Sequence, residues 1–377
     1  MPSQFDVCVS PSGELRHLLE EEILPAHRAQ WGAARSWDAN LDFQRALARY
    51  GWTAPGWPVE RGGLGLSVTE QLACAVVLHE LDVPPRVAVY GVNNVGPTII
   101  AWGTPEQQRH LHGIITVDEL WCQGFSEPDH GSDLAGLRTR ADRSGNDFVI
   151  NGQKTWTSIG MYATHCMVLA RTDQEAPKHR GISTLLVPLD TPGITRKPIR
   201  QMNGAAEFAE LFFDDVCVPS SALLGPFNEG WKVTMTTLGH ERAGVLAMAV
   251  QLAMDAERIV RDLPATGAGG GALRDRGIRI LTEAQVLRWT GQRLLAAEVG
   301  APDHLSPLIK LAWSNLGQRL RAFAVDSLGI ASVAGTAELP HATRLAASPS
   351  YSIAGGTTEV LKNIIAERVL QLPKTAP

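Results

Sequence analysis

The amino-acid sequence predicts an α+β protein in which a β domain lies between two helical domains. Helical patterns of apolar residues fill roughly the first 118 positions, an alternating apolar–polar pattern follows to about residue 225, and helical patterns then return to the end. We therefore expect domains at 1–118, 119–225 and 226–377. The 377 residues are enough for two or three domains with sizeable cores.

The N-terminal domain is predicted from three amphipathic segments separated by breaks such as APGWP and RGGLG. The segments are SGELRHLLEEEILPAHRAQ, NLDFQRALARYGW and SVTEQLACAVVLHELD. The HLH at 110–112 has the residue types of a metal pair. Alternating histidines beside Arg109 and Gln108 are more typical of a solvated helix face, so we expect no metal site.

The β domain is predicted from runs that alternate apolar and polar residues. In DFVINGQKTWTS, the pair Asn151-Gly152 predicts a hairpin turn, because both turn positions need positive φ. Further strands are expected at HCMVLART, ISTLLVPL and AELFFDDVCVP, the last ending near Pro219.

The C-terminal domain begins with a predicted helix over 228–261, and Glu241 is its most unusual residue. Glu241 shares one helical stripe with Thr234, Leu238, Val245, Met248 and Leu252, and no cation lies three or four residues away. Either it lies at the edge of the face or pairs with a distant arginine, or it is a carboxylate that chemistry requires. The later segment LPATGAGGGAL is expected to be a loop; Gly267, Gly269 and Ala272 match a GxGxxA pattern, but no strand precedes them.

Composition excludes several classes of function. A net charge of −5 and a pI near 6.1, with no basic block, argue against nucleic acid as a partner. No apolar run is long enough for membrane insertion, and the N-terminus lacks the features of a targeting segment. The five cysteines are scattered without CxxC pairs, which predicts reduced thiols, no structural zinc and a cytoplasmic location.

Four segments resemble the flavin-dependent acyl-CoA dehydrogenases: QGFSEPDHGSDLAGLRTRA, NGQKTWTS, FFDDVCVP and GGTTEVLKNIIAERVL. The resemblance covers nearly the whole chain, and its SEPxxGSD motif before KxWxS is specific. It implies an N-terminal helical domain, a central β-barrel or sandwich, and a C-terminal four-helix bundle. It also implies noncovalently bound FAD and a homodimer or homotetramer.

The resemblance assigns residues to the cofactor and the substrate. Positions matching Gln123, Phe125 and Ser126 contact the edge of the flavin ring, and those matching Trp156 and Ser158 pack on it and hydrogen-bond it. Ser132 and Arg242 are expected at the substrate. Three more residues are expected to contact FAD near a neighbouring subunit: Asp326, Thr357 and Glu359. Plain capping of the last helix is the alternative for Thr357 and Glu359.

Several positions depart from the family pattern. Asp129 stands where glycine is usual, Gln123 replaces a common tyrosine, and the RxTFG segment that supplies an arginine to the FAD pyrophosphate is missing. Arg274 or Arg276 in LRDRG is a candidate substitute. In SIAGGTTEV, Ala354 and Gly355 occupy the positions of the family's tyrosine and glutamate, so the usual base is absent.

The absent base and the anomalous Glu241 explain each other. A subset of the family carries its base on the helix after the β domain, at the position that Glu241 matches. The implied reaction is α,β-dehydrogenation of an acyl thioester: Glu241 removes the α-proton, flavin N5 takes the β-hydride, and the Gly355 N–H helps bind the thioester oxygen. The small Ala354 and Gly355 predict a preference for branched or bulky acyl groups.

Alternatives remain open at this point. The substrate is expected to be an acyl-CoA, or else an acyl or aminoacyl group on a carrier protein, with an electron-transfer flavoprotein-like acceptor. A second hypothesis is a non-catalytic subunit of a heteromeric dehydrogenase, which the missing pyrophosphate arginine favours. A third is a flavin oxidase or N-monooxygenase on the same fold.

Overall fold

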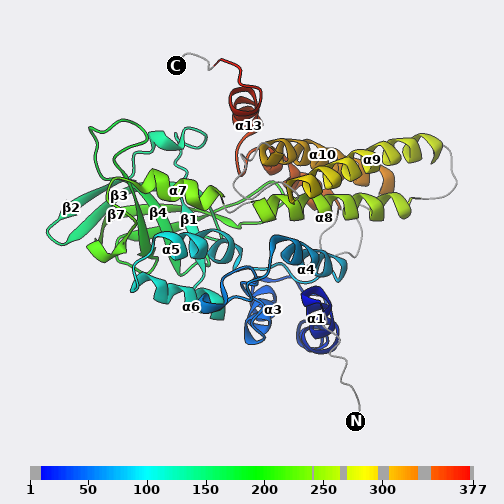
Figure 1. Cartoon of the computed structure of the whole chain (residues 1–377), viewed down its shortest axis with the longest axis horizontal. Coiled ribbons are helices and arrows are strands. Elements are labelled where there is room, and N and C mark those ends of the chain that lie inside the picture. The colour runs from blue at the N-terminus through cyan, green and yellow to red at the C-terminus, as the bar shows by residue number, and fades with distance from the viewer. Residues whose placement is uncertain (1–9, 240–241, 264–269, 296–304, 330–340, 374–377) are drawn as a thin grey trace, which may run out of the picture.

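The N-terminal part of the molecule consists of helices, as expected. The computed structural model describes residues 10–239, 242–263, 270–295, 305–329 and 341–373 (Figure 1). Its first helices are α1 Pro11–Leu18, α2 Leu24–Trp31, α3 Trp37–Arg49, α4 Val68–Glu80, α5 Gly96–Trp102 and α6 His110–Thr116. The three predicted segments are therefore helical. Capping side chains stabilise the N-termini of two of these helices: Ser36 caps α3, and Ser67 forms a capping box with Glu70 at α4.

The central part is one β-sheet built from eight strands. They are β1 Trp121–Gly124, β2 Arg140–Ser144, β3 Asp147–Ser158, β4 His165–Arg171, β5 Ile182–Pro188, β6 Ile194–Ile199, β7 Phe208–Pro219 and β8 Leu223–Leu224. Their order is β6-β7-β3-β2-β4-β5-β8, and β1 pairs with β4 in parallel. The predicted strands at β4, β5 and β7 are confirmed.

The predicted hairpin turn at Asn151-Gly152 is wrong. The chain turns earlier, at Gly145 (φ +61°), and β3 continues through Asn151 and Gly152. The register with β7 shifts between Ile150 and Gly152, where Asn151 Nδ2 donates to Asp215 Oδ1 and Asn151 Oδ1 accepts from the Asp215 N–H, both at 3.0 Å. Ile150 pairs with Val216 and Gly152 with Phe213, so Asn151 alone lies opposite Asp214 and Asp215, and the β-bulge is in β7, where Asp215 has φ +47°.

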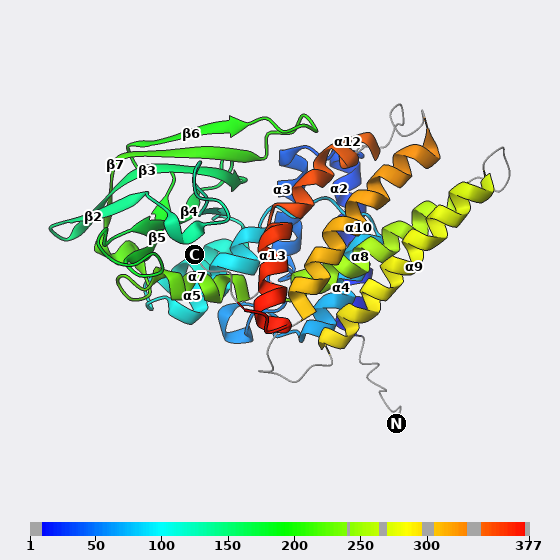
Figure 2. The same ribbon diagram turned by 90° about the horizontal axis from the view of Figure 1, so that it is seen from above.

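The C-terminal part is a bundle of long helices. α7 Gly230–Gly239 packs on β5, whereas α8 Arg242–Arg261, α9 Gly270–Leu295 and α10 Leu305–Leu328 lie along one another (Figure 2). α12 His341–Ala347 and α13 Thr358–Ile364 follow. The predicted helix at 228–261 is helical on both sides of residues 240–241, which lie outside the described residues. Most of the LPATGAGGGAL segment, with Gly267 and Gly269, lies outside them too.

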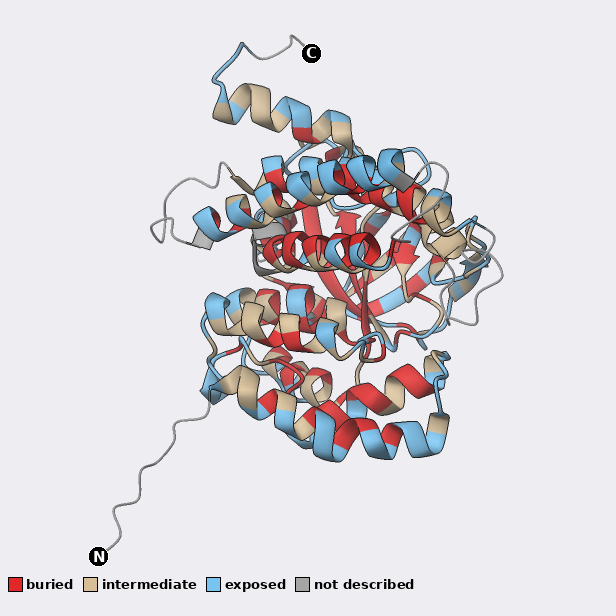
Figure 3. Ribbon diagram, turned by 90° about the vertical axis from the view of Figure 1, so that its right-hand side faces the viewer, coloured by how far each residue is buried: buried red, intermediate tan, exposed pale blue. Residues whose placement is uncertain are grey.

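The two helical parts are joined through α4, which packs against α8. Buried residues line the faces where these helices meet, and outward faces are exposed (Figure 3). One apolar core runs through α8, α9 and α10, with Leu252, Ile309 and Phe323 among its buried members. The β domain has a separate core that includes Phe148, Val168 and Leu211.

Two further expectations concern the thiols and the membrane. Cys74, Cys122, Cys166 and Cys217 are free, as predicted, and Cys8 lies outside the described residues. Among the described helices, none is both long and apolar enough to cross a bilayer.

The bulge generates a stability prediction. Gly152→Ala is expected to lower the free energy of unfolding by about 2–4 kcal/mol, because its Cβ would lie 2.5 Å from Thr139 Oγ1 and because φ is +149°. Gly145→Ala is the matched control: φ is +61° but nothing lies within 4 Å, so about 1–2 kcal/mol is expected. Chemical denaturation measures both, and equal losses would contradict the role of the close contact.

Candidate functional site

A buried ion pair attaches the loop after β1 to strand β3. Lys154 Nζ lies 2.8 Å from Glu127 Oε1, with the two side chains 0% and 6% exposed, and it also donates to the Phe125 carbonyl at 3.1 Å. Beside it, the Thr155 N–H donates to the Ser126 carbonyl at 2.9 Å. These bonds bring Phe125 and Ser126 next to the residues that precede Trp156.

Glu127 also orders the far end of the same loop. Its two oxygens accept from the backbone N–H groups of Arg138 at 2.7 Å and Thr139 at 2.8 Å. Burial raises the pKa of Glu127, but the Lys154 ammonium and these N–H groups more than offset that effect and hold the pKa below its usual range. A charged Glu127 therefore closes the loop 127–139, which carries Ser132. The sequence motif contains both ion-pair residues, but their pairing was not predicted.

Trp156 and Gln123 fit a flat aromatic cofactor. Trp156 is 58% exposed, although it is a large aromatic residue, and its φ of +56° is rare for a residue with a side chain. Its ring meets Phe208 edge-on at 5.8 Å, and Phe208 pairs in register with Ser158. Gln123 Nε2 is buried without a hydrogen-bond partner in the described residues. An uncovered indole and an unmatched donor are what an isoalloxazine ring would satisfy.

Ser132 lies in an exposed part of the loop. The neighbouring Asp133 pairs with Lys178 at 2.7 Å, which ties this part of the loop to the segment before β5. Asp129, the departure from the usual glycine, is also exposed. Both positions are therefore accessible to a substrate, and a negative charge at Asp129 faces solvent.

Of the residues expected to do the chemistry, the structure describes Gly355 but not Glu241. Glu241 lies outside the described residues, between the end of α7 and the start of α8, and the side chain of Arg242 is not described. Gly355 is exposed, with φ +65°, and follows the 3₁₀ helix η7 Ser348–Ser352. Lys310 Cε is the nearest atom to where a Gly355 Cβ would stand, at 3.5 Å.

The residues expected near a neighbouring subunit lie on two helices of the C-terminal part, α10 and α13. Asp326 is half-exposed at the end of α10 and pairs with Arg276 at 2.8 Å. Thr357 caps α13 by accepting from the Val360 N–H at 3.2 Å, and Glu359 is exposed in its first turn. α13 packs against α10 and stands away from the β domain (Figure 1). The capping alternative for Thr357 thus has direct support, which leaves its part in FAD binding untested.

The interpretation of the HLH segment as a solvated face is wrong for His110. His112 is exposed, but His110 is half-buried, with Nδ1 2.9 Å from Glu119 Oε2. His165 lies in the same cluster, and the three side chains place potential ligand atoms within 4.8 Å of one another. Trp121 Nε1 also donates to Glu119 at 2.9 Å, and the Trp121 ring stacks on His165. Contacts between distant segments, invisible to a local pattern, bury His110.

Three family models match the chain in order. They are the acyl-CoA dehydrogenase N-terminal domain over residues 12–117, the middle domain over 122–216 and the C-terminal domain over 228–370. The chain belongs to the acyl-CoA dehydrogenase family. It is therefore a member of a family of oxidoreductases that act on acyl-CoA, and the resemblance seen in the sequence is confirmed.

Relatives and solved structures agree over most of the chain. Acyl-CoA dehydrogenase IpdE1 of Mycolicibacterium smegmatis (strain ATCC 700084 / mc(2)155) is 40% identical over 355 residues, which cover 90% of this chain and 88% of the relative. The ChsE4-ChsE5 complex from Mycobacterium tuberculosis matches with a TM-score of 0.83 and 31% identity, covering 97% of both chains. The Tcur3481-Tcur3483 steroid ACAD matches with a TM-score of 0.84 and 28% identity, with the same coverage.

The buried pair predicts how the site responds to mutation. Glu127→Gln is expected to cost about 3–5 kcal/mol of unfolding free energy, because it leaves Lys154 charged and unpaired. Asp142→Asn, which breaks an exposed pair with Arg140 on β2, is the control and should cost less than about 1 kcal/mol. Equal effects in urea denaturation would contradict the importance of the buried pair.

The same pair has a pH signature. The folded-state pKa of Glu127 is lowered, so the charged Glu127 stabilises the folded state fully above its unfolded-state pKa of about 4.3. That contribution is lost as pH falls through the lower folded-state pKa. The stability difference between wild type and Glu127→Gln should therefore be constant from neutral pH to about pH 5 and shrink below about pH 4. A constant difference down to pH 2 would argue against this linkage.

Proposed function

We propose that the protein catalyses FAD-dependent α,β-dehydrogenation of an acyl-CoA, with Glu241 as the base. The observation that carries this assignment is Gly355, a glycine with φ +65° at the usual position of the family's glutamate. A carboxylate is needed to accept the α-proton, and Glu241, between α7 and α8, is the candidate that the sequence offers. The Gly355 N–H would donate to the thioester oxygen and stabilise the charge that develops there.

In this proposal the chain's own residues position the cofactor and the substrate. FAD, when bound, supplies a hydride acceptor. Trp156 would cover the ring, while Gln123 and Ser126 would hydrogen-bond its edge and Ser158 its other side. Ser132 and Arg242 would contact the thioester and its CoA part. The ion pair between Lys154 and Glu127 would hold the cofactor-binding side chains in position before FAD or substrate binds.

We also propose that the protein is an oligomer. It would be a homodimer, a homotetramer or a heteromer with a homologous subunit. α9 exposes Ile278, Val286 and Trp289 on one face, a pattern that a single solvated chain does not need. Asp326 and Thr357 would then lie near a neighbour's FAD. Two of the matching solved structures have titles that name two proteins, ChsE4-ChsE5 and Tcur3481-Tcur3483. The proposed electron acceptor is an electron-transfer flavoprotein.

The proposed substrate is an acyl-CoA with a bulky acyl group. Relatives are named acyl-CoA dehydrogenases, which favours CoA over a carrier protein as the acyl carrier. Ala354 and Gly355 are small and exposed, so the wall that they form next to the thioester leaves room for branching or rings.

A non-catalytic subunit is the second candidate function. The observation in its favour is that Arg276, the candidate for the FAD pyrophosphate, is paired with Asp326 at 2.8 Å and lies over the Phe323 ring. A group held in this way has less freedom to bind phosphate.

Purification separates the two functions. We expect a yellow protein with noncovalently bound FAD, at least dimeric in light scattering, when the chain is expressed with excess flavin. The reason is the exposed Trp156 together with the apolar face of α9. A colourless monomer under these conditions would support the non-catalytic subunit.

Glu241→Gln tests the base directly. The variant should fold, bind FAD and bind acyl-CoA, yet lose flavin reduction by on the order of 10² to 10⁴ in rate, because the amide cannot accept a proton. Anaerobic stopped-flow bleaching measures this loss. Glu257→Gln, an exposed glutamate on α8, is the control and should behave as wild type. Near wild-type bleaching by Glu241→Gln would exclude Glu241 as the base.

A further inference from the structure

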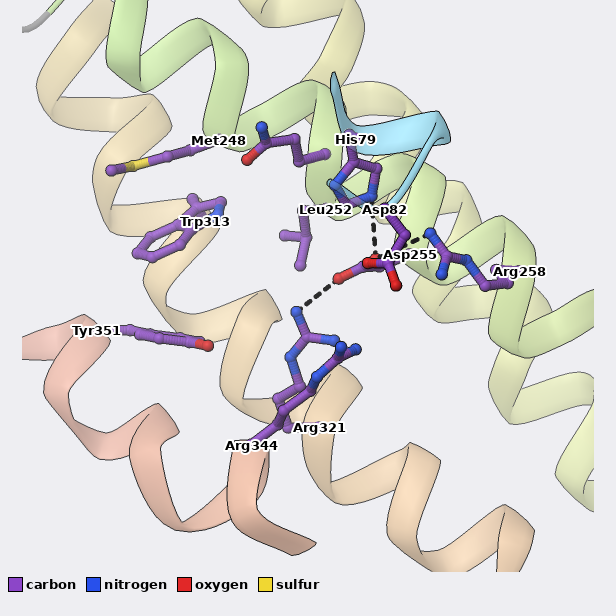
Figure 4. A pocket seen from close by; sticks show the side chains of 11 residues that line it. His79, Asp82, Met248, Leu252, Asp255, Arg258, Trp313, Arg321, Arg344 and Tyr351 are labelled. Carbon is purple, nitrogen blue, oxygen red and sulfur yellow. Dashed lines mark hydrogen bonds and ion pairs between the residues drawn. The ribbon is translucent and has the colours of Figure 1, made fainter. Parts of the chain in front are cut away.

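A cavity of about 300 Å³ lies between α4, α8, α10 and the 3₁₀ helix η7 (Figure 4). Two of its walls are formed by α8, which follows Glu241 in the sequence, and by η7, which precedes Gly355. Met248 on α8 lines it and follows Glu241 by seven residues, about 10 Å along a helix. Tyr351 on η7 also lines it and precedes Gly355 by four residues. An acyl group extending from the thioester along α8 would therefore enter this cavity.

The cavity has a charged end, which a hydrocarbon chain does not need. Asp255 on α8 is nearly buried, and its two oxygens are already engaged: Oδ2 by Arg321 Nη2 at 2.6 Å, and Oδ1 by His79 Nε2 at 3.1 Å. Burial raises the pKa of Asp255, but His79 and Arg321 more than offset this and hold it well below its usual range. The carboxylate is therefore charged, and each of its oxygens already has a cationic partner.

Hydrogen-bond donors outnumber acceptors at this end. Arg321 is only 12% exposed, and its Nε and Nη1 atoms are buried without a hydrogen-bond partner among the described residues. Arg258 and Arg344 also line the cavity, and Arg258 Nη2 lies 4.0 Å from Asp255 Oδ1. The other lining carboxylate, Asp82, is largely exposed and binds Arg35 at 3.1 Å. Buried N–H groups left unmatched cost free energy, so an acceptor at this place would be bound favourably.

The rest of the lining suits a bulky apolar body. The rings of Trp313 and Tyr351 lie 4.7 Å apart with a 38° tilt, and Leu252 and Met248 provide apolar surface between α8 and these rings. Figure 4 shows the Tyr351 hydroxyl on the side of the cavity where Arg321 lies. Asp255 accounts for one nitrogen of Arg321, and the Tyr351 hydroxyl is a further polar group that interacts with the guanidinium, so joining the helices explains only part of this arrangement.

We propose that this cavity receives the far end of the acyl group, and that this end carries an oxygen acceptor, a ketone or a carboxylate, bound by Arg321. The inference rests on the proposed dehydrogenation and adds the substrate class. The acyl group would span more than about 10 Å from the α-carbon, the rise of seven helical residues. Arg321 acts here as a residue that determines specificity and takes no part in the chemistry.

The test compares three CoA thioesters that differ only at the far end of a ten-carbon chain: decanoyl-CoA, 9-oxodecanoyl-CoA and the CoA monothioester of decanedioic acid. We expect the FAD-loaded enzyme to prefer one oxygenated substrate by about 10- to 100-fold in kcat/KM for flavin bleaching, the effect of a hydrogen bond to a charged group. The preferred one distinguishes a ketone from a carboxylate.

Variants locate the preference. Arg321→Lys keeps a positive charge beside Asp255 but loses the unmatched N–H groups, so the preference ratio should fall at least fivefold. Arg319→Lys, two residues away in an exposed pair with Glu283, is the matched control and should keep the wild-type ratio. Met248→Trp fills the cavity from a partly exposed position and should also lower the ratio, which provides a second variant if Arg321→Lys does not fold.

The outcomes separate the two proposals. Bleaching by decanoyl-CoA equal to or faster than by both oxygenated substrates would overturn the inference and leave the dehydrogenation intact. An unchanged ratio in Arg321→Lys, or in Met248→Trp, would overturn the assignment to this cavity. No bleaching by these three substrates, by butyryl-CoA or by a branched substrate such as isobutyryl-CoA would overturn the proposed function itself, and the inference with it.

Discussion

The ion pair between Lys154 and Glu127 is the constraint on which the proposed cofactor site depends. Burying two opposite charges is costly, and it is tolerated here because Glu127 also accepts two backbone N–H groups and Lys154 donates to the Phe125 carbonyl. One buried carboxylate thus fixes both ends of a loop of irregular structure. A loop held in this way can present Ser126 beside Trp156 although neither lies in a regular ladder.

A second buried carboxylate plays the comparable part in the helical half of the molecule. Asp255 joins His79 of α4 to Arg321 of α10, so three helices from two parts of the chain meet at one charge. The α4 contact matters because α8 otherwise packs within its own bundle. The partners of both carboxylates are far apart in the sequence, so only the fold shows the two ion pairs. Glu127 lies next to the proposed cofactor site, and Asp255 lines the cavity of the proposed acyl site.

Local patterns predicted the elements well and their long-range contacts poorly. The helices α3 and α4 follow from periodicity, because one buried face leaves a repeat in the sequence, whereas β4 and β5 are continuous apolar runs buried on both faces. Asn151-Gly152 was placed in a turn because the pair is typical of hairpin turns, whereas the pair continues strand β3 opposite a bulge in β7, and only the fold brings Asp215 to Asn151. His110 was placed on a solvated face because the local pattern does not show its partner, Glu119, which the fold brings near.

The candidate site shows the same division. Gln123, Trp156 and Ser158 were found because a motif carries them, whereas Arg321 and Asp255 lie in stretches without any motif. Chemistry shared by a family requires fixed residues at fixed spacing, so it leaves a motif. Recognition of one acyl group requires only that some side chain reach the far end of the cavity, and helices from different parts of the chain can supply it. In the proposed site, substrate specificity is therefore the part of function that leaves no motif in the sequence, and the buried donor Arg321 Nε becomes visible only in the fold.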